Sequence, residues 1–280
     1  MRIGDLLREA AGRLAEAGID GGQREARLLL QAAADIPVAT QIAFPERAVE
    51  TAAAARFHAL AARRARREPM AHILGRREFW SLTFKVTADT LDPRPDSETL
   101  VQAVLDQIPD RAAPLRLVDF GTGTGCLLLA LLHELPNAAG LGIDASAAAL
   151  AVAQENAHAL GLGSRTSFRQ GDWDDGLVPA FDILLSNPPY IPSGDIAVLQ
   201  PEVASFEPRL ALDGGAEGLI AYRRLAPAAV RLLAEGGLAA FEVGLGQADS
   251  VIGICQAARL RHIATAGDLG AVPRCVLFRK

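Results

Sequence analysis

Residues that commonly bind metals or form disulfides are scarce in this chain. Its three cysteines, Cys126, Cys255 and Cys275, lie far apart in apolar surroundings and form no CxxC pair, and its five histidines are equally scattered. Isolated cysteines in apolar segments are typically buried, reduced thiols. We therefore expect no disulfide framework and no metal site.

The chain also lacks an excess of basic residues and any long apolar segment. It has 28 Lys and Arg against 33 Asp and Glu, so it has no overall attraction to nucleic acid or to an anionic membrane. No segment stays apolar for the roughly 20 residues of a membrane-spanning helix, and the N-terminus lacks the apolar core of a secretion signal. We expect a cytoplasmic protein. Half of its 280 residues are hydrophobic, enough for one large domain or two smaller ones.

The N-terminal part of the chain has a helical pattern. Across residues 1–75, leucines from Leu6 to Leu30 recur at helical spacing with alanines between them, which predicts a small N-terminal helical domain. The same segment holds one dense basic cluster, Arg63, Arg64, Arg66 and Arg67. We expect this cluster to form a solvated helix face rather than a contact for phosphate or an acidic partner.

A β-hairpin linker is predicted at residues 76–92, because apolar and polar residues roughly alternate there. Two prolines then impose an extended segment around Arg94. The side chain of Asp96 or Ser97 can cap the helix that follows. The segment is either a linker with a good helix cap or a wall of an active site that carries Arg94 and Glu98, and spacing alone does not choose between them.

Residues 93–280 predict an α/β fold. Strand and helix patterns alternate, which is typical of a doubly wound, mostly parallel sheet covered by helices on both faces. Strands are expected at 115–120, 139–143, 166–169, 181–185, 237–243, 261–265 and 274–278. Helices are expected at 126–135, 147–160, 218–233 and 247–258.

A glycine-rich turn joins the first of these strands to its helix. It consists of Asp119, Phe120, Gly121, Thr122, Gly123, Thr124 and Gly125. Its glycines let the backbone approach a ligand closely. The GxGxG spacing differs from the GxGxxG of dinucleotide sites and lacks the Lys of a P-loop. A nucleoside cofactor with little or no phosphate is therefore favoured over NAD or ATP.

Polar residues also follow the next strands. Asp144 can accept hydrogen bonds from ribose hydroxyls, or it can cap the following helix. Asp172 and Trp173 can hold an adenine edge and face, although Trp173 can equally be a packing residue. Because these residues fall at successive strand ends on one edge of the sheet, together they indicate a nucleoside site.

The last of these strand ends is Ser186-Asn187-Pro188-Pro189-Tyr190. The prolines hold the chain extended, so this NPPY motif presents a rigid set of acceptors beside a flat ring. Two acceptors beside a ring suit a planar NH2 group, while the alternative is an ordinary turn at the end of a strand.

Together these features resemble a known family. The glycine-rich turn, Asp144 and the NPPY motif resemble class I S-adenosylmethionine-dependent methyltransferases. Segments 93–98, 187–190 and 206–212, with Gly214, Gly215 and Gly218, resemble more narrowly the peptide chain release factor glutamine methyltransferases of the PrmC/HemK family, over essentially the whole chain. The chain departs from this pattern at Asp92, where the family usually has an apolar residue, and at Ser97, where it usually has Thr.

The resemblance implies a fold and an activity. The fold is a seven-stranded Rossmann-like methyltransferase sheet with a helical N-terminal domain for partner recognition. The activity is methyl transfer from S-adenosyl-L-methionine, leaving S-adenosyl-L-homocysteine, to N5 of the glutamine in the GGQ motif of class I peptide chain release factors, which modulates translation termination. A cytoplasmic monomer that uses no metal, membrane or direct nucleic-acid contact is expected.

The resemblance also implies roles for individual residues. Asn187 and Pro188 each accept one N–H of the substrate amide, and Tyr190 packs against its plane; these three are the expected catalytic residues. The expected cofactor-binding residues are Asp119, Gly121, Thr122, Gly123, Thr124, Gly125, Asp144, Asp172, Trp173 and Asn187. The expected substrate-binding residues are Asn187, Pro188, Pro189, Tyr190, Arg94 and Glu98.

Two other functions stay open. An N6-adenine or N2-guanine methyltransferase uses the same pair of acceptors on a flipped base, but it predicts a basic groove. A non-enzymatic S-adenosylmethionine-binding factor needs no NPPY motif.

Overall fold

The chain folds into two compact units. The structure is a computed structural model that describes residues 1–174, 176–179 and 181–280. The first unit holds Met1–Gly75 and Gln200–Phe206, and the second holds Arg76–Leu199 and Glu207–Lys280. The segment expected as a hairpin linker therefore falls within the second unit. Within the described residues, no helix is both long enough and apolar enough to cross a membrane.

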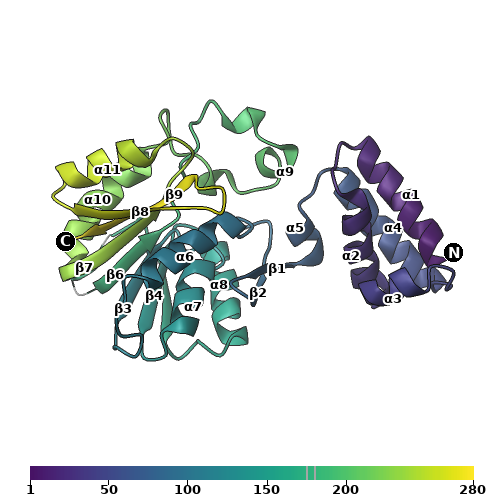
Figure 1. The fold of residues 1–280 in the computed structure, drawn as a ribbon, viewed down its shortest axis with the longest axis horizontal. Coiled ribbons are helices and arrows are strands. Elements are labelled where there is room, and N and C mark those ends of the chain that lie inside the picture. The colour runs from purple at the N-terminus through teal and green to yellow at the C-terminus, as the bar shows by residue number, and fades with distance from the viewer. Residues whose placement is uncertain (175, 180) are drawn as a thin grey trace. The chain divides into compact units, whose positions relative to one another are not determined.

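The first unit is a helical bundle (Figure 1). Apolar side chains on one face of each long helix bury a core in which Phe57 is fully covered. The helices are α1 (Ile3–Glu16), α2 (Gly22–Ala34), α3 (Val38–Ala43), α4 (Thr51–Ala65), α5 (Met70–Leu74) and α9 (Pro201–Ala204). The prediction of a helical N-terminal region is confirmed, but α9 comes from a distant part of the chain.

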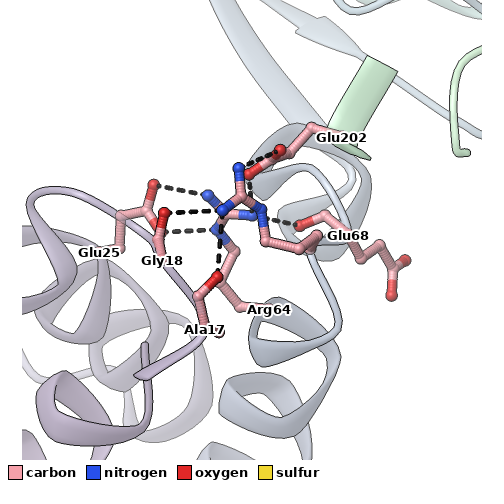
Figure 2. Close-up of polar contacts among 7 residues, drawn as sticks. Ala17, Gly18, Glu25, Arg64, Glu68 and Glu202 are labelled. Atoms are coloured by element: carbon pink, nitrogen blue, oxygen red, sulfur yellow. Dashed lines mark hydrogen bonds and ion pairs between the residues drawn. The ribbon is translucent and has the colours of Figure 1, made fainter. Parts of the chain in front are cut away.

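Figure 2 shows Arg64, near the end of α4, beside Glu202 of α9 within this unit. The side chain of Arg64 is only 7% exposed, and it donates to Glu25 Oε2 at 2.6 Å and to Glu202 Oε1 at 2.9 Å. Arg67 donates to the other oxygen of Glu202 at 2.7 Å. The expectation of a solvated face is wrong for Arg64, because the local pattern cannot show that a carboxylate 138 residues away packs against it.

Removing the charge of Glu202 is expected to destabilise the first unit. In Glu202→Gln the guanidinium groups of Arg64 and Arg67 face a neutral amide, and we expect a loss of about 1.5–3 kcal/mol in the free energy of opening. Hydrogen exchange at the amides of α2 and α4 measures this loss.

Glu217→Gln is the matched control for this prediction. The ion pair between Glu217 and Arg223 is exposed on both sides, and such pairs contribute about 0.2–1 kcal/mol. Equal effects of the two substitutions, each measured on its own unit, contradict an anchoring role for Glu202.

The second unit is built on a sheet with the strand order β5-β4-β3-β6-β7-β9-β8. β9 pairs antiparallel with β7 and β8, and the other pairs are parallel. The strands are β3 (Arg116–Phe120), β4 (Ala139–Asp144), β5 (Thr166–Gln170), β6 (Phe181–Ser186), β7 (Leu233–Glu242), β8 (Arg261–Gly267) and β9 (Pro273–Arg279). The predicted mostly parallel seven-stranded sheet is confirmed. Its strand order reverses between β3 and β6, where sheets of this class bind ligands.

Helices cover both faces of the sheet (Figure 1). Neighbouring residues of one strand point to opposite faces, so Leu117 lies in one hydrophobic core and Val118 in the other. One face packs against α6 (Glu98–Leu105), α7 (Cys126–Glu134) and α8 (Ala147–Ala159). The other packs against α10 (Ile220–Leu232) and α11 (Ala248–Ala257). The predicted doubly wound arrangement is confirmed.

The predicted hairpin is also confirmed. β1 (Arg76–Phe79) pairs antiparallel with β2 (Leu82–Lys85). Trp80 and Ser81 between them have φ of 52° and 58°, which matches the two-residue turns that follow the twist of a hairpin. The Trp80 amide donates to Glu98 Oε1 at 2.7 Å, which holds the hairpin against the start of α6.

The start of α6 differs from the prediction. The turn η1 (Pro95–Ser97) precedes it, and neither Asp96 nor Ser97 caps the helix with its side chain. Asp96 instead pairs with Arg274 at 3.0 Å, and Ser97 is buried. The predicted cap is wrong because both side chains bind partners that are distant in the sequence. Two similar turns, η2 (Ile196–Val198) and η3 (Arg209–Ala211), lie between β6 and α10.

Candidate active site

A cavity of about 190 Å³ lies at the carboxyl ends of β3, β4 and β6, within the second unit. Ten of the residues expected in the site line it: Arg94, Gly121, Thr122, Gly123, Thr124, Asp144, Asp172, Trp173, Asn187 and Pro189. The other five expected residues, Glu98, Asp119, Gly125, Pro188 and Tyr190, are not among its lining residues. The parallel sheet thus brings the polar strand ends to one place, as the sequence order predicts.

The glycine-rich turn presents bare backbone to this cavity. Gly121, Gly123 and Gly125 have φ of 70°, 53° and 80°, a region that glycine adopts without strain. A Cβ at Gly121 would project into open space, whereas one at Gly125 would lie 3.1 Å from Leu129 Cδ1. The first glycine therefore leaves room for a ligand, and the last lets α7 begin close to the turn.

Asp119 lies beneath this turn and is 1% exposed. Its Oδ2 accepts from the Thr122 hydroxyl at 2.7 Å, and its Oδ1 has no hydrogen-bond partner among the described residues. Burial raises the pKa of this carboxyl to about 7, although the bond from Thr122 opposes the shift. Because the folded protein holds this proton more tightly than the unfolded chain, this group lowers stability as the pH rises towards 7. A donor supplied by a ligand relieves that cost.

Asp144 connects the glycine-rich turn to the end of β4. Its two oxygens accept from the Gly123 and Ser146 amides, both at 2.9 Å. The helix cap of α8 is Ser146, which accepts from the Ala149 amide at 3.2 Å, so Asp144 is not the cap. An ionised carboxylate has about four acceptor positions. Two therefore stay available at the cavity wall, enough for a pair of ribose hydroxyls.

Asp172 and Trp173 form the wall beyond β5. Trp173 has φ of 59° and lies beside Phe120, with the ring centroids 6.4 Å apart. Asp172 forms an ion pair with Arg224 at 3.1 Å that is exposed on both sides. Trp173 thus contributes both to the core and to the cavity wall, so its interpretation as a packing residue is compatible with that as a surface for adenine.

The NPPY motif continues directly from β6. The Ser186 hydroxyl donates to the Phe120 carbonyl at 2.7 Å, which holds the ends of β6 and β3 together. Asn187 and Pro189 line the cavity. Tyr190 packs instead against the core beneath α10 and α11, and its hydroxyl donates to Glu242 Oε1 at 3.4 Å. The Tyr190 ring, which we expected beside the substrate, therefore lies on the core side of the NPPY motif and holds the motif in place.

A glycine-rich segment after η3 packs against the NPPY backbone. A Cβ on Gly214 would lie 2.7 Å from the Pro189 carbonyl oxygen, and one on Gly218 would lie 2.2 Å from that of Tyr190. Real Cβ atoms do not approach other atoms so closely. These two glycines are therefore required by the close approach of two backbone segments.

The two polar residues expected in the site from the segment at the start of α6, Arg94 and Glu98, lie in different places. Arg94 lines the cavity and pairs with Glu207 at 3.0 Å, where Glu207 is fully buried. Burial raises the pKa of Glu207 to about 7, while the charge of Arg94 opposes this. Glu98 accepts from Trp80 outside the cavity, so the structure gives it a structural contact in place of the expected substrate contact. The sequence left open whether this segment is a linker or a wall of the site. The structure places Arg94 in the cavity wall and Glu98 outside it.

Glu242 is a site-related residue that sequence reasoning missed. It ends the buried strand β7, is 3% exposed, and its Oε1 accepts from the Tyr190 hydroxyl at 3.4 Å. A single carboxylate at the end of the apolar run Leu238–Phe241 is a signal that the sequence does contain. Its partners, however, become visible only when strand ends that are distant in the chain lie side by side.

The cavity fits S-adenosylmethionine. The bare backbone at Gly121 leaves space, and Asp144 has acceptor positions left for a ribose. Beneath the turn, Asp119 Oδ1 is a buried acceptor that has no donor among the described residues. Trp173 supplies a flat surface for a purine. Among the described residues, no group of His, Cys, Asp and Glu is arranged to hold a metal ion.

The chain is similar to known proteins along its whole length. Residues 5–75 match the family model of the PrmC N-terminal domain, and residues 89–236 match that of the Methyltransferase small domain. The release factor glutamine methyltransferase of Rhodospirillum rubrum is 46% identical over 99% of this chain and 85% of its own length. That of Cereibacter sphaeroides is 46% identical over 100% of this chain and 99% of its own length.

Among solved structures, the hMettl16 catalytic domain in complex with the MAT2A 3′UTR hairpin 1 aligns with a TM-score of 0.57. It shares 14% identity over 78% of this chain and 80% of that one, which supports the fold alone. The two matching family models and the full-length relatives show the family as well as the fold. The chain belongs to the release factor glutamine methyltransferase family.

Proposed function

We propose that the protein methylates N5 of the glutamine side chain in the GGQ motif of class I peptide chain release factors. The observation that carries the proposal is the position of Asn187 and Pro189 in the wall of a cavity that the glycine-rich turn also lines. That arrangement suits a planar amide next to a nucleoside cofactor. The release factors named in the relatives supply the substrate class.

In this proposal the cofactor-binding residues are those of the glycine-rich turn, Asp119, Asp144, Asp172 and Trp173. When bound, S-adenosylmethionine supplies an electrophilic methyl group on a sulfonium. The bare backbone of the turn admits the cofactor closely, and the free acceptor positions of Asp144 hold its ribose. The buried wall excludes water from the reacting atoms.

An amide nitrogen is a poor nucleophile because its lone pair is delocalised over the carbonyl group. We assign Asn187 Oδ1 and the Pro188 carbonyl as acceptors, one for each N–H of the substrate amide. Two acceptors held by a rigid strand end fix the direction of the nitrogen and favour the partly pyramidal geometry of the transition state. Tyr190 keeps that strand end in place through its contacts with the core.

Arg94 and Pro189 complete the substrate wall in this proposal. Arg94 is held by Glu207, so its guanidinium has a defined position at the cavity. The assignment of release-factor recognition to the helical domain at residues 1–75 stays a prediction.

The test is a methylation assay with labelled S-adenosylmethionine. We expect transfer to a release factor with an intact GGQ motif, mass spectrometry to locate the methyl group on that glutamine, and no transfer when the glutamine is replaced. Transfer to DNA or RNA but not to the release factor would support a nucleobase methyltransferase instead. Cofactor binding without transfer to any of these substrates would support a non-enzymatic binder.

A further inference from the structure

We propose that Arg94 binds the α-carboxylate in the methionyl part of S-adenosylmethionine, and that Glu207 is the positioning residue that holds Arg94 for this contact. The resemblance implied a contact between Arg94 and the substrate, and the inference narrows that role to the cofactor. It deepens the proposed function and rests on one part of it, namely that the cofactor is S-adenosylmethionine.

Arg94 supplies the positive charge of the cavity wall. Among the described residues that line the cavity, it is the only Lys, Arg or His, whereas negative charge comes from Asp89, Asp144 and Asp172. S-adenosylmethionine carries one anionic group, its α-carboxylate, beside a cationic ammonium and a cationic sulfonium. The GGQ motif of the substrate contains no charged side chain. The carboxylate is therefore the group that a single guanidinium in this wall complements.

Arg94 lies at the end of the cavity where the methyl group is transferred in the proposed function. Ser97, on the same segment, accepts from Asn187 Nδ2 at 3.3 Å, which places the segment beside the NPPY motif. The acceptor positions for the ribose belong to Asp144 at the end of β4, which is separated from β6 by β3. The methionyl part of the cofactor carries the methyl group and therefore belongs at the Arg94 end.

Glu207 fixes both the guanidinium and the backbone beside it. Its side chain is fully buried, its Oε1 accepts from Arg94 Nη2 at 3.0 Å, and its Oε2 accepts from the Asp92 amide at 3.2 Å. The side chain of Arg94 is 38% exposed and lines the cavity. Because a guanidinium has five N–H donors in a planar fork, Arg94 can bond to Glu207 and to a second carboxylate in the cavity at the same time.

A structural role alone explains this ion pair poorly. An ion pair with a buried partner is often no more stabilising than apolar residues of similar volume. Arg94 also faces a cavity that accepts a cationic sulfonium, and two positive charges at close range repel. A carboxylate on the cofactor turns that repulsion into attraction. An arginine in this wall is thus useful to an enzyme whose cofactor brings an anion to it.

Binding of two ligands tests the contact without turnover. S-adenosyl-L-homocysteine and its decarboxylated analogue, S-adenosyl-3-thiopropylamine, differ only in the carboxylate. We expect Arg94→Ala to raise the Kd for S-adenosyl-L-homocysteine by about 10–100-fold in isothermal titration calorimetry, the effect of one charge-assisted contact. The same substitution should not weaken binding of the analogue, and its retained binding shows that the rest of the site is folded.

Further variants separate the charge of Arg94 from its position. Arg94→Lys keeps the charge but loses the planar fork, so we expect a smaller rise in the Kd for S-adenosyl-L-homocysteine than in Arg94→Ala. Glu207→Ala releases the guanidinium and should raise that Kd about three- to tenfold. In the Arg94→Ala background, Glu207→Ala should add nothing, because it acts through Arg94. This double variant also carries no unpaired buried charge from the ion pair. Losses that add contradict a positioning role for Glu207.

Arg223→Ala is the matched control. Arg223 forms an exposed ion pair with Glu217 and is not among the residues that line the cavity, so the Kd for S-adenosyl-L-homocysteine should equal that of the wild type.

Two outcomes overturn the assignment of Arg94. Equal weakening of both ligands by Arg94→Ala means that Arg94 shapes the site without meeting the carboxylate. An unchanged Kd for S-adenosyl-L-homocysteine, with a raised KM for the release factor, assigns Arg94 to the substrate instead. If the wild-type protein binds S-adenosyl-L-homocysteine through Arg94 but does not methylate a release factor, the proposed function fails and this inference stands.

Discussion

Asn187→Ala is expected to lower kcat for methylation of the release factor by about 10²–10³-fold, the usual cost of removing one preorganised hydrogen-bonding group at a reacting centre. The substitution removes the acceptor that orients the substrate amide. The alanine fits the same extended backbone before Pro188, so the fold is kept. Single-turnover kinetics with saturating cofactor measure the methyl-transfer step itself.

Asn137→Ala is the control for this prediction. Asn137 is exposed, does not line the cavity, and its side chain donates to the Ala112 carbonyl at 2.8 Å, so its loss should leave kcat unchanged. Asn187→Asp is a more conservative variant. It keeps the shape of the side chain but loses the NH2 group that donates to Ser97 Oγ, so it tests that group alone. Turnover by Asn187→Ala within about tenfold of wild type would remove Asn187 from the catalytic role.

Gly218→Ala is expected to cost about 2–5 kcal/mol in the free energy of unfolding and to disturb the NPPY motif. Its φ of 72° costs an alanine about 1–2 kcal/mol. Its Cβ would also lie 2.2 Å from the Tyr190 carbonyl oxygen and 2.5 Å from Gln247 Nε2, and forced overpacking adds about 1–3 kcal/mol. Gln247 Nε2 donates to that same oxygen at 2.9 Å, so the clash breaks the bond that holds Tyr190.

Gly236→Ala isolates the steric part of this effect. Gly236 has nearly the same φ, 73°, but a Cβ there meets nothing within 4 Å. Denaturant unfolding should show only the backbone cost of about 1–2 kcal/mol for this variant, and its methylation rate should equal that of the wild type. Equal destabilisation by the two substitutions would mean that the segment at Gly218 can move away from the NPPY motif.

Element type could be predicted from the sequence wherever the local pattern and the tertiary environment agree. The strand that ends at Ser186 is a short apolar run followed by Pro188, and its burial on both faces of a parallel sheet requires such a run. The hairpin alternates because one of its faces packs on the core. The site residues at the ends of β3, β4 and β6 could be predicted as a group, because parallel strands bring their carboxyl ends to one edge.

Side-chain partners could not be predicted, because they join segments far apart in the chain. Ser97 has the sequence context of a helix cap, yet its hydroxyl oxygen accepts from Asn187 Nδ2 at 3.3 Å. Glu98 could have pointed into the site, yet it holds the hairpin through Trp80. Arg64 has the context of a surface residue, yet it is buried against Glu202. In each case the position of the side chain depends on which group from a distant part of the chain packs against it, and the local sequence does not contain that information.

For the NPPY motif, the sequence by itself determined a rigid strand end with acceptor groups. Proline restricts its own backbone and that of the residue before it, whatever surrounds them. Only the tertiary structure decided which way the Asn187 amide faces and that Tyr190 lies behind the motif rather than in the cavity. Those choices depend on Ser97, Glu242 and the glycines at 214 and 218, which reach the motif only when the sheet and its connecting segments pack together.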